Sequence, residues 1–95
     1  MANVVVTIRV MPESVDVDIN SLNIEVMKHL KKFTGREDEE SYKQSIVPVA
    51  FGLNAIQVIF VYDEKKGGTD PVEDVLRNLE GVGGVEVIDV RRAMG

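Results

Sequence analysis

The stretch from residue 45 to residue 62 constrains the fold most strongly, because two apolar runs meet there with almost nothing between them. It reads S-I-V-P-V-A-F-G-L-N-A-I-Q-V-I-F-V-Y. Two such runs predict a hairpin with one strand, a tight bend at Phe51 and Gly52, and a second, fully buried strand. Glycine adopts positive φ angles at no steric cost, so Gly52 is expected to make the bend. Pro48 cannot donate a ladder hydrogen bond, so the first strand is expected at a sheet edge or with this proline facing outward.

The other regular elements follow from the spacing of apolar residues and from capping residues. An apolar stripe recurs at intervals of three and four after Asp18, which is the expected N-cap of a helix that Gly35 ends. A second helix is expected after the N-cap Asp70, with proline next, a glutamate in the capping-box position, and its end at Gly81. Apolar runs predict strands at residues 4–11, 42–49, 53–62 and 85–90.

The resulting element order, βαββαβ, is typical of a ferredoxin-like α+β sandwich. This fold has a four-stranded antiparallel sheet in the order 4-1-3-2, with two helices on one face. The most apolar strands, at residues 4–11 and 53–62, fall at the centre of that sheet. The predicted helical stripes are Ile19, Leu22, Val26, Leu30 and Phe33, then Val72, Val75, Leu76 and Leu79. The hairpin bend and the C-terminus are expected at opposite ends of the sheet, roughly 20–25 Å apart for strands of about seven residues.

The composition limits the classes of function. A chain of 95 residues is expected to form one domain, spanning residues 1–95, and its 44% of hydrophobic residues suffice for one core. The formal net charge of −5 disfavours direct binding to nucleic acid, whose phosphates require a basic surface. There is no cysteine, and no apolar run approaches the ~20 residues that span a bilayer. We therefore expect a cytoplasmic protein that does not enter a membrane.

No pattern of reactive side chains indicates an enzyme. His29 is the only histidine, and no cysteine or second histidine completes a ligand set or a catalytic triad. Residues 67–69, G-G-T, precede a helix whose first amides could bind an anion. However, Pro71 removes one of these amides and Asp70 repels phosphate. We therefore expect no catalytic residue, no cofactor and no metal.

Two features are better explained by contact with a partner protein than by packing in a core. Phe51 lies in the hairpin bend, where its ring either folds onto the end of the sheet or serves as an aromatic anchor for a partner. Arg91, Arg92 and Met94 are expected in a free C-terminal tail of an otherwise acidic chain. Together with Gly52, these are the candidate partner-binding residues.

The hairpin also carries a family resemblance. Residues 48–58, P-V-A-F-G-L-N-A-I-Q-V, resemble the signature P-[IV]-[AG]-[FY]-G-[IL]-x-x-[LI]-Q-[VI] in the exchange-factor domain of translation elongation factor 1-beta. The likeness extends along the chain to M-P-E, G-G-T-D and V-I-D-V, and the whole chain resembles the short archaeal form. The resemblance implies a guanine-nucleotide exchange factor for elongation factor 1-alpha, the GTPase that delivers aminoacyl-tRNA to the ribosome.

The resemblance also implies where the partner is contacted. In eukaryotic relatives the domain contacts its GTPase with the hairpin phenylalanine and with C-terminal residues that reach toward the phosphate and magnesium region. Phe51 and Gly52 match the first contact, and residues 89–94 occupy the second. The eukaryotic pattern has lysines after the hairpin, where this chain has N-A, and a lysine next to last, where this chain ends A-M-G. Arg91 and Arg92 are the nearest cations.

An alternative is a regulatory ferredoxin-like domain that binds a small metabolite and acts as a homodimer. It predicts a pocket at the loop between the first strand and the first helix, and no role for Phe51 or the C-terminal tail. A phosphate hydrolase of the same fold would need a cationic cradle in that loop, where M-P-E supplies an acid instead. Neither alternative accounts for the hairpin signature.

Overall fold

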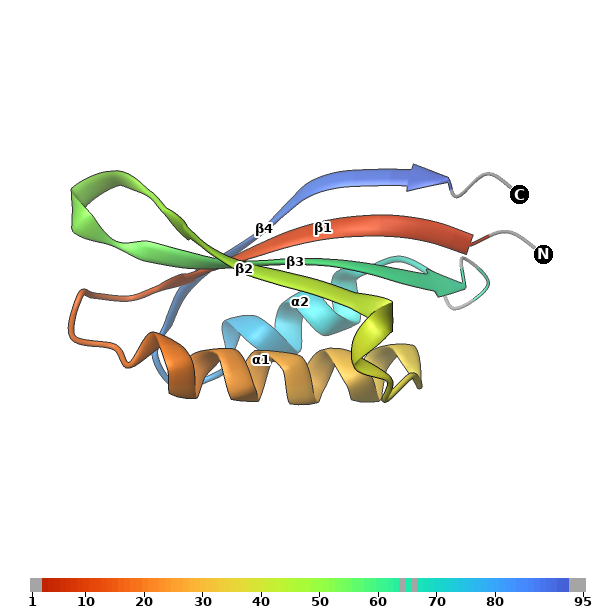
Figure 1. Cartoon of the computed structure of the whole chain (residues 1–95), viewed down its shortest axis with the longest axis horizontal. Helices are drawn as coiled ribbons and strands as arrows, with labels where there is room; N and C mark the ends of the chain where they lie inside the picture. The colour runs from red at the N-terminus through yellow and green to blue at the C-terminus, as the bar shows by residue number, and fades with distance from the viewer. Residues whose placement is uncertain (1–2, 64, 66, 93–95) are drawn as a thin grey trace.

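The structure, a computed structural model, describes residues 3–63, 65 and 67–92, with the backbone alone for residue 39. Four strands form one antiparallel sheet in the order β2-β3-β1-β4, and two α-helices lie on one of its faces (Figure 1). The elements are β1 (Asn3–Pro12), α1 (Ile19–Thr34), the 3₁₀ turn η1 (Glu39–Ser41), β2 (Tyr42–Pro48), the turn η2 (Ala50–Gly52), β3 (Asn54–Asp63), α2 (Asp70–Arg77) and β4 (Val82–Arg92). The predicted ferredoxin-like βαββαβ fold is confirmed, since 4-1-3-2 is the same sheet read from its other edge.

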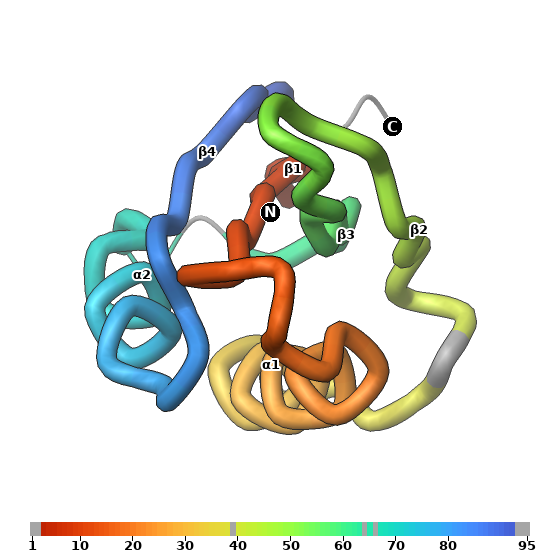
Figure 2. The backbone as a smooth tube through the Cα atoms, turned by 90° about the vertical axis from the view of Figure 1, so that its left-hand side faces the viewer, coloured from red at the N-terminus to blue at the C-terminus, as the bar shows by residue number. Residues whose placement is uncertain are grey.

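The core lies between the sheet and the helices, which sit next to each other on the same side (Figure 2). Strict alternation in β1 decides which of its side chains enter the core: positions 4, 6, 8 and 10 are buried, and the residues between them face the open side. β1 and β3 are the central strands, and β2, which contains Pro48, is an edge strand, as predicted. In the part of the chain that the structure describes, no helix is long and apolar enough to cross a membrane.

α1 begins and ends at the residues that its capping signals predict. The Asp18 carboxylate accepts hydrogen bonds from the amides of Asn20 (3.1 Å) and Ser21 (3.4 Å). Gly35 closes the helix in the left-handed conformation, with a φ of 75°, and its amide donates to the carbonyl of Lys31 at 2.9 Å. These bonds satisfy backbone groups that have no partner within the helix. The predicted N-cap and helix stop are both confirmed.

The Asp18 cap makes the stability of the protein depend on pH. Hydrogen bonds from the amide and hydroxyl of Ser21, and from the amide of Asn20, hold the pKa of Asp18 below its ordinary value of 3.8. A carboxyl whose pKa is lowered by folding stabilises the protein above its unfolded pKa, and this contribution is lost as the pH falls through the folded pKa. Asp18→Ala should therefore lower the urea midpoint at neutral pH, with a difference from wild type that shrinks as the pH falls below 3.8.

Asp18→Asn is the control for this pH effect, because an asparagine side chain caps a helix without titrating. Its urea midpoint should stay near that of wild type at neutral pH. An Asp18→Ala deficit of the same size at neutral and at strongly acid pH would show that the ionised cap has no part in stability.

α2 differs from its prediction at both ends. Its N-cap is Thr69, not Asp70, and the Thr69 hydroxyl donates to the carboxylate of Glu73 at 2.8 Å in place of the predicted capping box. The helix has eight residues and stops at the C-cap Asn78. Gly81, with a φ of 92°, lies in the connection that follows and does not end the helix.

The buried stripe of α2 is narrower than predicted. Val72 and Leu76, four residues apart, are buried, and Leu79 packs against the core from beyond the helix. Val75 is 44% exposed and faces the outer groove between the two helices. A helix of two turns has room for one buried pair, so the prediction that Val75 is buried is wrong. In α1 the predicted stripe is in place, and Met27 is buried beside it.

β4 is longer than predicted and reaches Arg92 at the end of the described chain. Two of its residues, Gly83 and Ile88, have no partner in the register with β1, and each marks a bulge. β1 and β3 have ten residues and β4 has eleven, so a strand spans about 33 Å and the estimate from shorter strands was too low. The molecule is 42 Å long, with the hairpin at one end and the end of β4 at the other (Figure 1).

Candidate functional site

The β2–β3 hairpin turns at Phe51 and Gly52, as predicted, and both residues have left-handed backbones. φ is 62° at Phe51, with a ψ of 29°, and 74° at Gly52. The amide of Leu53 donates to the carbonyl of Ala50 at 3.3 Å, and the amide of Val49 donates to the carbonyl of Leu53 at 2.8 Å. The two positive φ angles and the hydrogen bond from Leu53 to Ala50 define a type I′ turn. The backbone twist of this turn type matches the twist of the two strands that it joins. A Cβ at Gly52 would meet no atom within 4 Å, so it is the positive φ that favours glycine here, and not a lack of space for a side chain.

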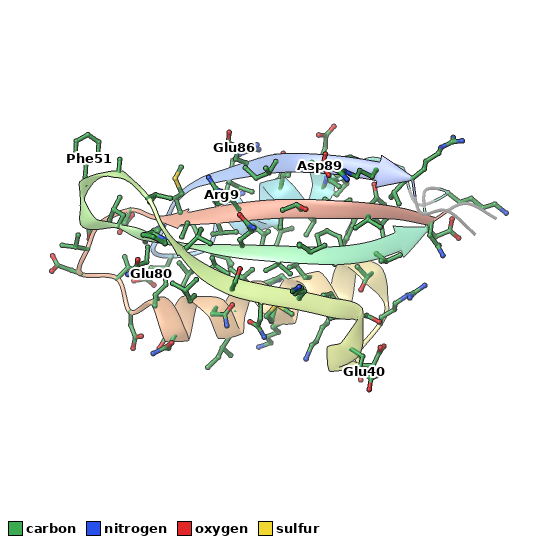
Figure 3. All side chains as sticks on the ribbon, turned by 45° about the horizontal axis from the view of Figure 1, so that its top comes forward. Arg9, Glu40, Phe51, Glu80, Glu86 and Asp89 are labelled. Carbon is green, nitrogen blue, oxygen red and sulfur yellow. The ribbon has the colours of Figure 1, made fainter. Side chains whose placement is uncertain are left out.

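Phe51 is an unfavourable residue for the first central position of this turn. The left-handed conformation costs an ordinary residue about 1–2 kcal/mol, and asparagine is preferred there because it tolerates this conformation. The ring is 96% exposed and projects from the tip of the hairpin (Figure 3), so it does not fold onto the end of the sheet. Among the described residues, Phe51 alone combines a side chain with a positive φ. Strained backbones and exposed aromatic rings are both common at binding sites, so Phe51 stays a candidate contact residue.

The C-terminal arginines belong to a strand and not to a free tail, which corrects the prediction. Arg91 and Arg92 pair with the first residues of β1. The side chain of Arg91 is 78% exposed, and its Nε lies 2.6 Å from Oδ2 of Asp89. Pairing with β1 extends the strand through polar residues that have no strand pattern of their own. Met94, the third candidate in this segment, lies outside the described residues.

The two candidate contacts lie at opposite ends of the molecule, and the open face of the sheet runs between them. Arg9, Glu86 and Asp89 lie on this face (Figure 3). Nη2 of Arg9 donates to Oε1 of Gln57 at 3.0 Å, across the β1–β3 pair. The structure therefore does not bring Phe51 and the arginines together, and only a partner that extends along the long axis can touch both.

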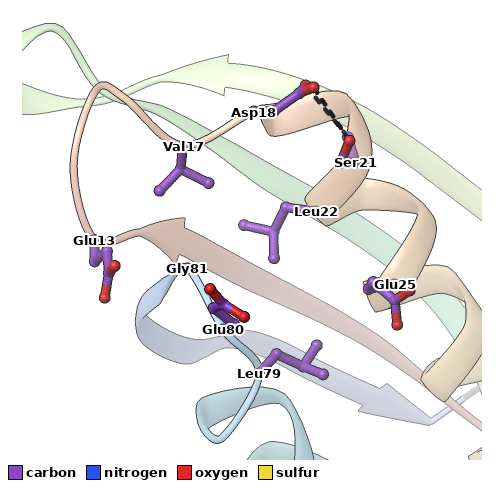
Figure 4. Close-up of a pocket in the computed structure, with 9 residues that line it drawn as sticks. All are labelled: Glu13, Val17, Asp18, Ser21, Leu22, Glu25, Leu79, Glu80 and Gly81. Carbon is purple, nitrogen blue, oxygen red and sulfur yellow. Dashed lines mark hydrogen bonds between the residues drawn. The ribbon is translucent and has the colours of Figure 1, made fainter.

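Two cavities open beside the loop at residues 13–18, which joins β1 to α1. The larger one, of about 590 Å³, lies between this loop, the start of α1 and the connection from α2 to β4 (Figure 4). Its lining includes the carboxylates of Glu13, Asp18, Glu25 and Glu80 and the apolar side chains of Val17, Leu22 and Leu79. The smaller one, of about 240 Å³, lies between the same loop and the hairpin. Within residues 3–63, 65 and 67–92, no three His, Cys, Asp or Glu side chains are placed to hold a metal ion.

Val15 is a surface residue that the sequence analysis did not identify. It is 67% exposed, and it lines the smaller cavity together with Gly52 and Leu53 of the hairpin. The sequence contained a signal for an exposed apolar residue here, because Val15 lies within the acidic segment E-S-V-D-V-D and outside every periodic apolar stripe. Val17, in the same segment, packs against the core instead, so the sequence does not decide which valine is exposed.

Comparisons with known proteins match nearly the whole chain to one family. Residues 5–93 match the family described as the EF-1 guanine nucleotide exchange domain. Elongation factor 1-beta of Methanothermobacter thermautotrophicus (strain Delta H) is 44% identical over 94 residues, which cover 99% of this chain and 100% of the relative. Elongation factor 1-beta of Staphylothermus marinus is 40% identical over 93 residues, or 97% and 98% of the two chains.

Among solved structures, the de novo designed protein Foldit4 is similar, with a TM-score of 0.53, 16% identity and 98% of each chain covered. At this identity the likeness supports the fold alone. The family assignment rests on the sequence matches, which include the hairpin at Phe51 and Gly52 and the strand that ends at Arg92. The chain therefore belongs to the elongation factor 1-beta family and carries its guanine nucleotide exchange domain.

Proposed function

We propose that the protein is a guanine-nucleotide exchange factor for elongation factor 1-alpha, promoting GDP release and GTP reloading during polypeptide elongation. Membership of the elongation factor 1-beta family supports this role. The single observation that carries the proposal at the level of residues is Phe51, a fully exposed ring on a strained turn at one end of the sheet. An aromatic ring on a short, hydrogen-bonded hairpin is suited to fill a pocket of a partner protein.

The exchange requires no bond-making by this protein, and we propose that it acts through differential binding. A factor that binds the nucleotide-free GTPase more tightly than the GDP-bound form weakens GDP binding by the same ratio, because linkage is reciprocal. Each factor of ten in that ratio corresponds to about 1.4 kcal/mol of coupling free energy. Phe51 anchors the factor on one part of the GTPase, and Arg91 and Arg92 act on another. Positive charge brought next to a bound Mg²⁺ repels the ion, which favours loss of the metal and of the nucleotide.

Isothermal titration calorimetry tests this proposal directly at the level of affinity. The factor should bind nucleotide-free elongation factor 1-alpha at least about tenfold more tightly than the GDP-bound form. GDP should in turn bind the factor–GTPase complex more weakly than the free GTPase, by the same ratio. Equal affinity of the factor for the two forms would contradict the proposal, because a ligand without preference shifts no equilibrium.

Replacing Arg91 and Arg92 by glutamine tests the second contact. The change removes two charges and keeps the backbone pairing of β4 with β1. We expect the double variant to accelerate GDP release about tenfold less than wild type, because a positive charge placed beside the ion bound to the partner repels that ion strongly. The thermal midpoint should stay close to that of wild type, since exposed ion pairs contribute little to stability. Stopped-flow release of fluorescent GDP measures the effect, and undiminished acceleration would exclude both arginines from the site.

The alternative of a metabolite-binding homodimer gains one observation, the cavity of about 590 Å³ beside the loop at residues 13–18. This is where that alternative predicts a pocket. The acidic lining of the cavity disfavours phosphorylated or carboxylated metabolites, and family membership supports the exchange role instead. Because translation elongation takes place in the cytoplasm, the proposed role also assigns the protein to that compartment.

A further inference from the structure

Three connections meet at the end of the sheet that carries Phe51. We call residues 13–18, 49–53 and 78–81 the hairpin end. The amide of Glu13 donates to the carbonyl of Gly81 at 2.9 Å, and the smaller cavity separates the first segment from the hairpin, so the three are neighbours. The hairpin end contains no lysine, arginine or histidine. It contains four carboxylates, those of Glu13, Asp16, Asp18 and Glu80.

Three of these carboxylates have no structural role in the described part of the chain. Asp18 caps α1, but the side chains of Glu13, Asp16 and Glu80 form no hydrogen bond or ion pair with a described residue. Glu13 and Glu80 both line the larger cavity (Figure 4). Like charges that share a small surface repel one another. A positively charged partner surface would remove that repulsion.

Two exposed apolar side chains accompany the negative charge. Phe51 is 96% exposed and Val15 is 67% exposed, and they come from separate loops. These loops are adjacent, since Val15 and Gly52 line the same cavity. Apolar side chains inside a rim of charged residues are typical of a protein–protein contact, in which the centre supplies affinity and the rim supplies complementarity.

We propose that the hairpin end binds a basic surface of the GTPase that contains an apolar pocket. Phe51 and Val15 form the apolar centre of the contact, and Glu13, Asp16 and Glu80 form its acidic rim. This inference rests on the proposed exchange function, and it adds the loop between β1 and α1 and the sign of the partner's charge. Electrostatic attraction of this kind acts mainly on the association rate and is weakened by salt.

Charge reversal tests the acidic rim, with the full chain and nucleotide-free elongation factor 1-alpha. Asp16→Lys changes an exposed loop residue, and Glu40→Lys makes the same change at the opposite corner of the molecule (Figure 3). At about 50 mM salt, Asp16→Lys should slow association about three- to tenfold, and at about 500 mM the deficit should fall below about twofold. Glu40→Lys should stay within about twofold of wild type at both salt concentrations.

Val15→Ser tests the apolar centre. It should raise the dissociation rate about three- to tenfold at both salt concentrations, because the loss of an apolar contact is not screened. The far-ultraviolet circular dichroism should match that of wild type, since the side chain is mostly exposed in the free protein.

The outcomes separate this inference from the proposed function. If wild type binds the GTPase but Asp16→Lys behaves like Glu40→Lys, the acidic rim is overturned while the exchange role stands. If Val15→Ser dissociates at the wild-type rate, Val15 is excluded from the contact, and the exchange role again stands. If wild type does not bind the GTPase at all, the exchange function and the inference are both overturned.

Discussion

Phe51→Asn should remove most of the exchange activity and, at the same time, stabilise the protein. Asparagine suits the first central position of a type I′ turn, so relief of the strained φ of 62° should raise the free energy of unfolding by about 1 kcal/mol. Loss of an aromatic anchor should cost about 2 kcal/mol of binding, or roughly thirtyfold in affinity for the GTPase. Urea denaturation measures the first effect, and stopped-flow release of fluorescent GDP measures the second.

The opposite signs of the two effects make this variant informative, because most substitutions that lower activity also lower stability. Ile24→Gln is the control, since Ile24 is another exposed apolar residue, on the outer face of α1. It should leave GDP release within about twofold of wild type. Full exchange activity in Phe51→Asn would exclude the ring from the contact, and a loss of stability would contradict the strained turn.

Gly83→Ala should destabilise the fold strongly. A Cβ on this residue would lie 2.8 Å from both the Cα of Glu13 and the carbonyl oxygen of Pro12, and 3.1 Å from the amide nitrogen of Glu13. These atoms belong to the backbone, so β4 or the end of β1 would have to move. We expect a loss of about 2–3 kcal/mol in the free energy of unfolding, measured by urea denaturation.

Gly84→Ala is the matched control for this steric argument. A Cβ there would lie 3.5 Å from Cε of Met11, which is an ordinary contact with the end of a flexible side chain. The free energy of unfolding should change by less than about 1 kcal/mol. Equal losses for the two alanine variants would contradict the close approach of β4 to β1 at Gly83.

The sequence predicted the fold class because the central elements carry strong and redundant signals. β1 alternates strictly, and its buried positions match the apolar ones from Val4 to Val10. Asp18 and Gly35 define α1 through local hydrogen bonds and a left-handed backbone, which depend on neighbouring residues alone. Because Pro48 lacks a donor, it limited β2 to a sheet edge or to a register with the proline facing outward, and β2 is an edge strand. Each of these signals acts over a few residues, so each can be recognised without the tertiary structure.

The errors fall where tertiary contacts override local pattern. β4 continues through Arg91 and Arg92 because β1 offers partners there, and near its start Gly83 allows a close approach to the loop after β1. Neither stretch has the apolar alternation that predicts a strand. Val75 was predicted to be buried because its spacing fits a helical stripe, but the two-turn length of α2 leaves it at the outer groove.

The candidate site was predictable only in part. The position of Phe51 and Gly52 in a tight bend follows from the two apolar runs around them. The left-handed backbone of Phe51 and the exposure of its ring do not, since both depend on how the turn closes and on the absence of a neighbour at the tip. The acidic character of the hairpin end also depends on tertiary structure, because Glu80 lies far from Glu13 and Asp16 in the sequence and joins them through the fold.

Release of GDP from elongation factor 1-alpha tests the central claim most directly. The GTPase is loaded with fluorescent GDP, mixed with excess unlabelled GTP, and followed by stopped flow with less than one factor per GTPase. Wild type should accelerate release in proportion to its concentration and turn over many GTPase molecules, because it acts without being consumed. If folded wild-type protein leaves the release rate unchanged at every concentration, the protein is not an exchange factor for this GTPase.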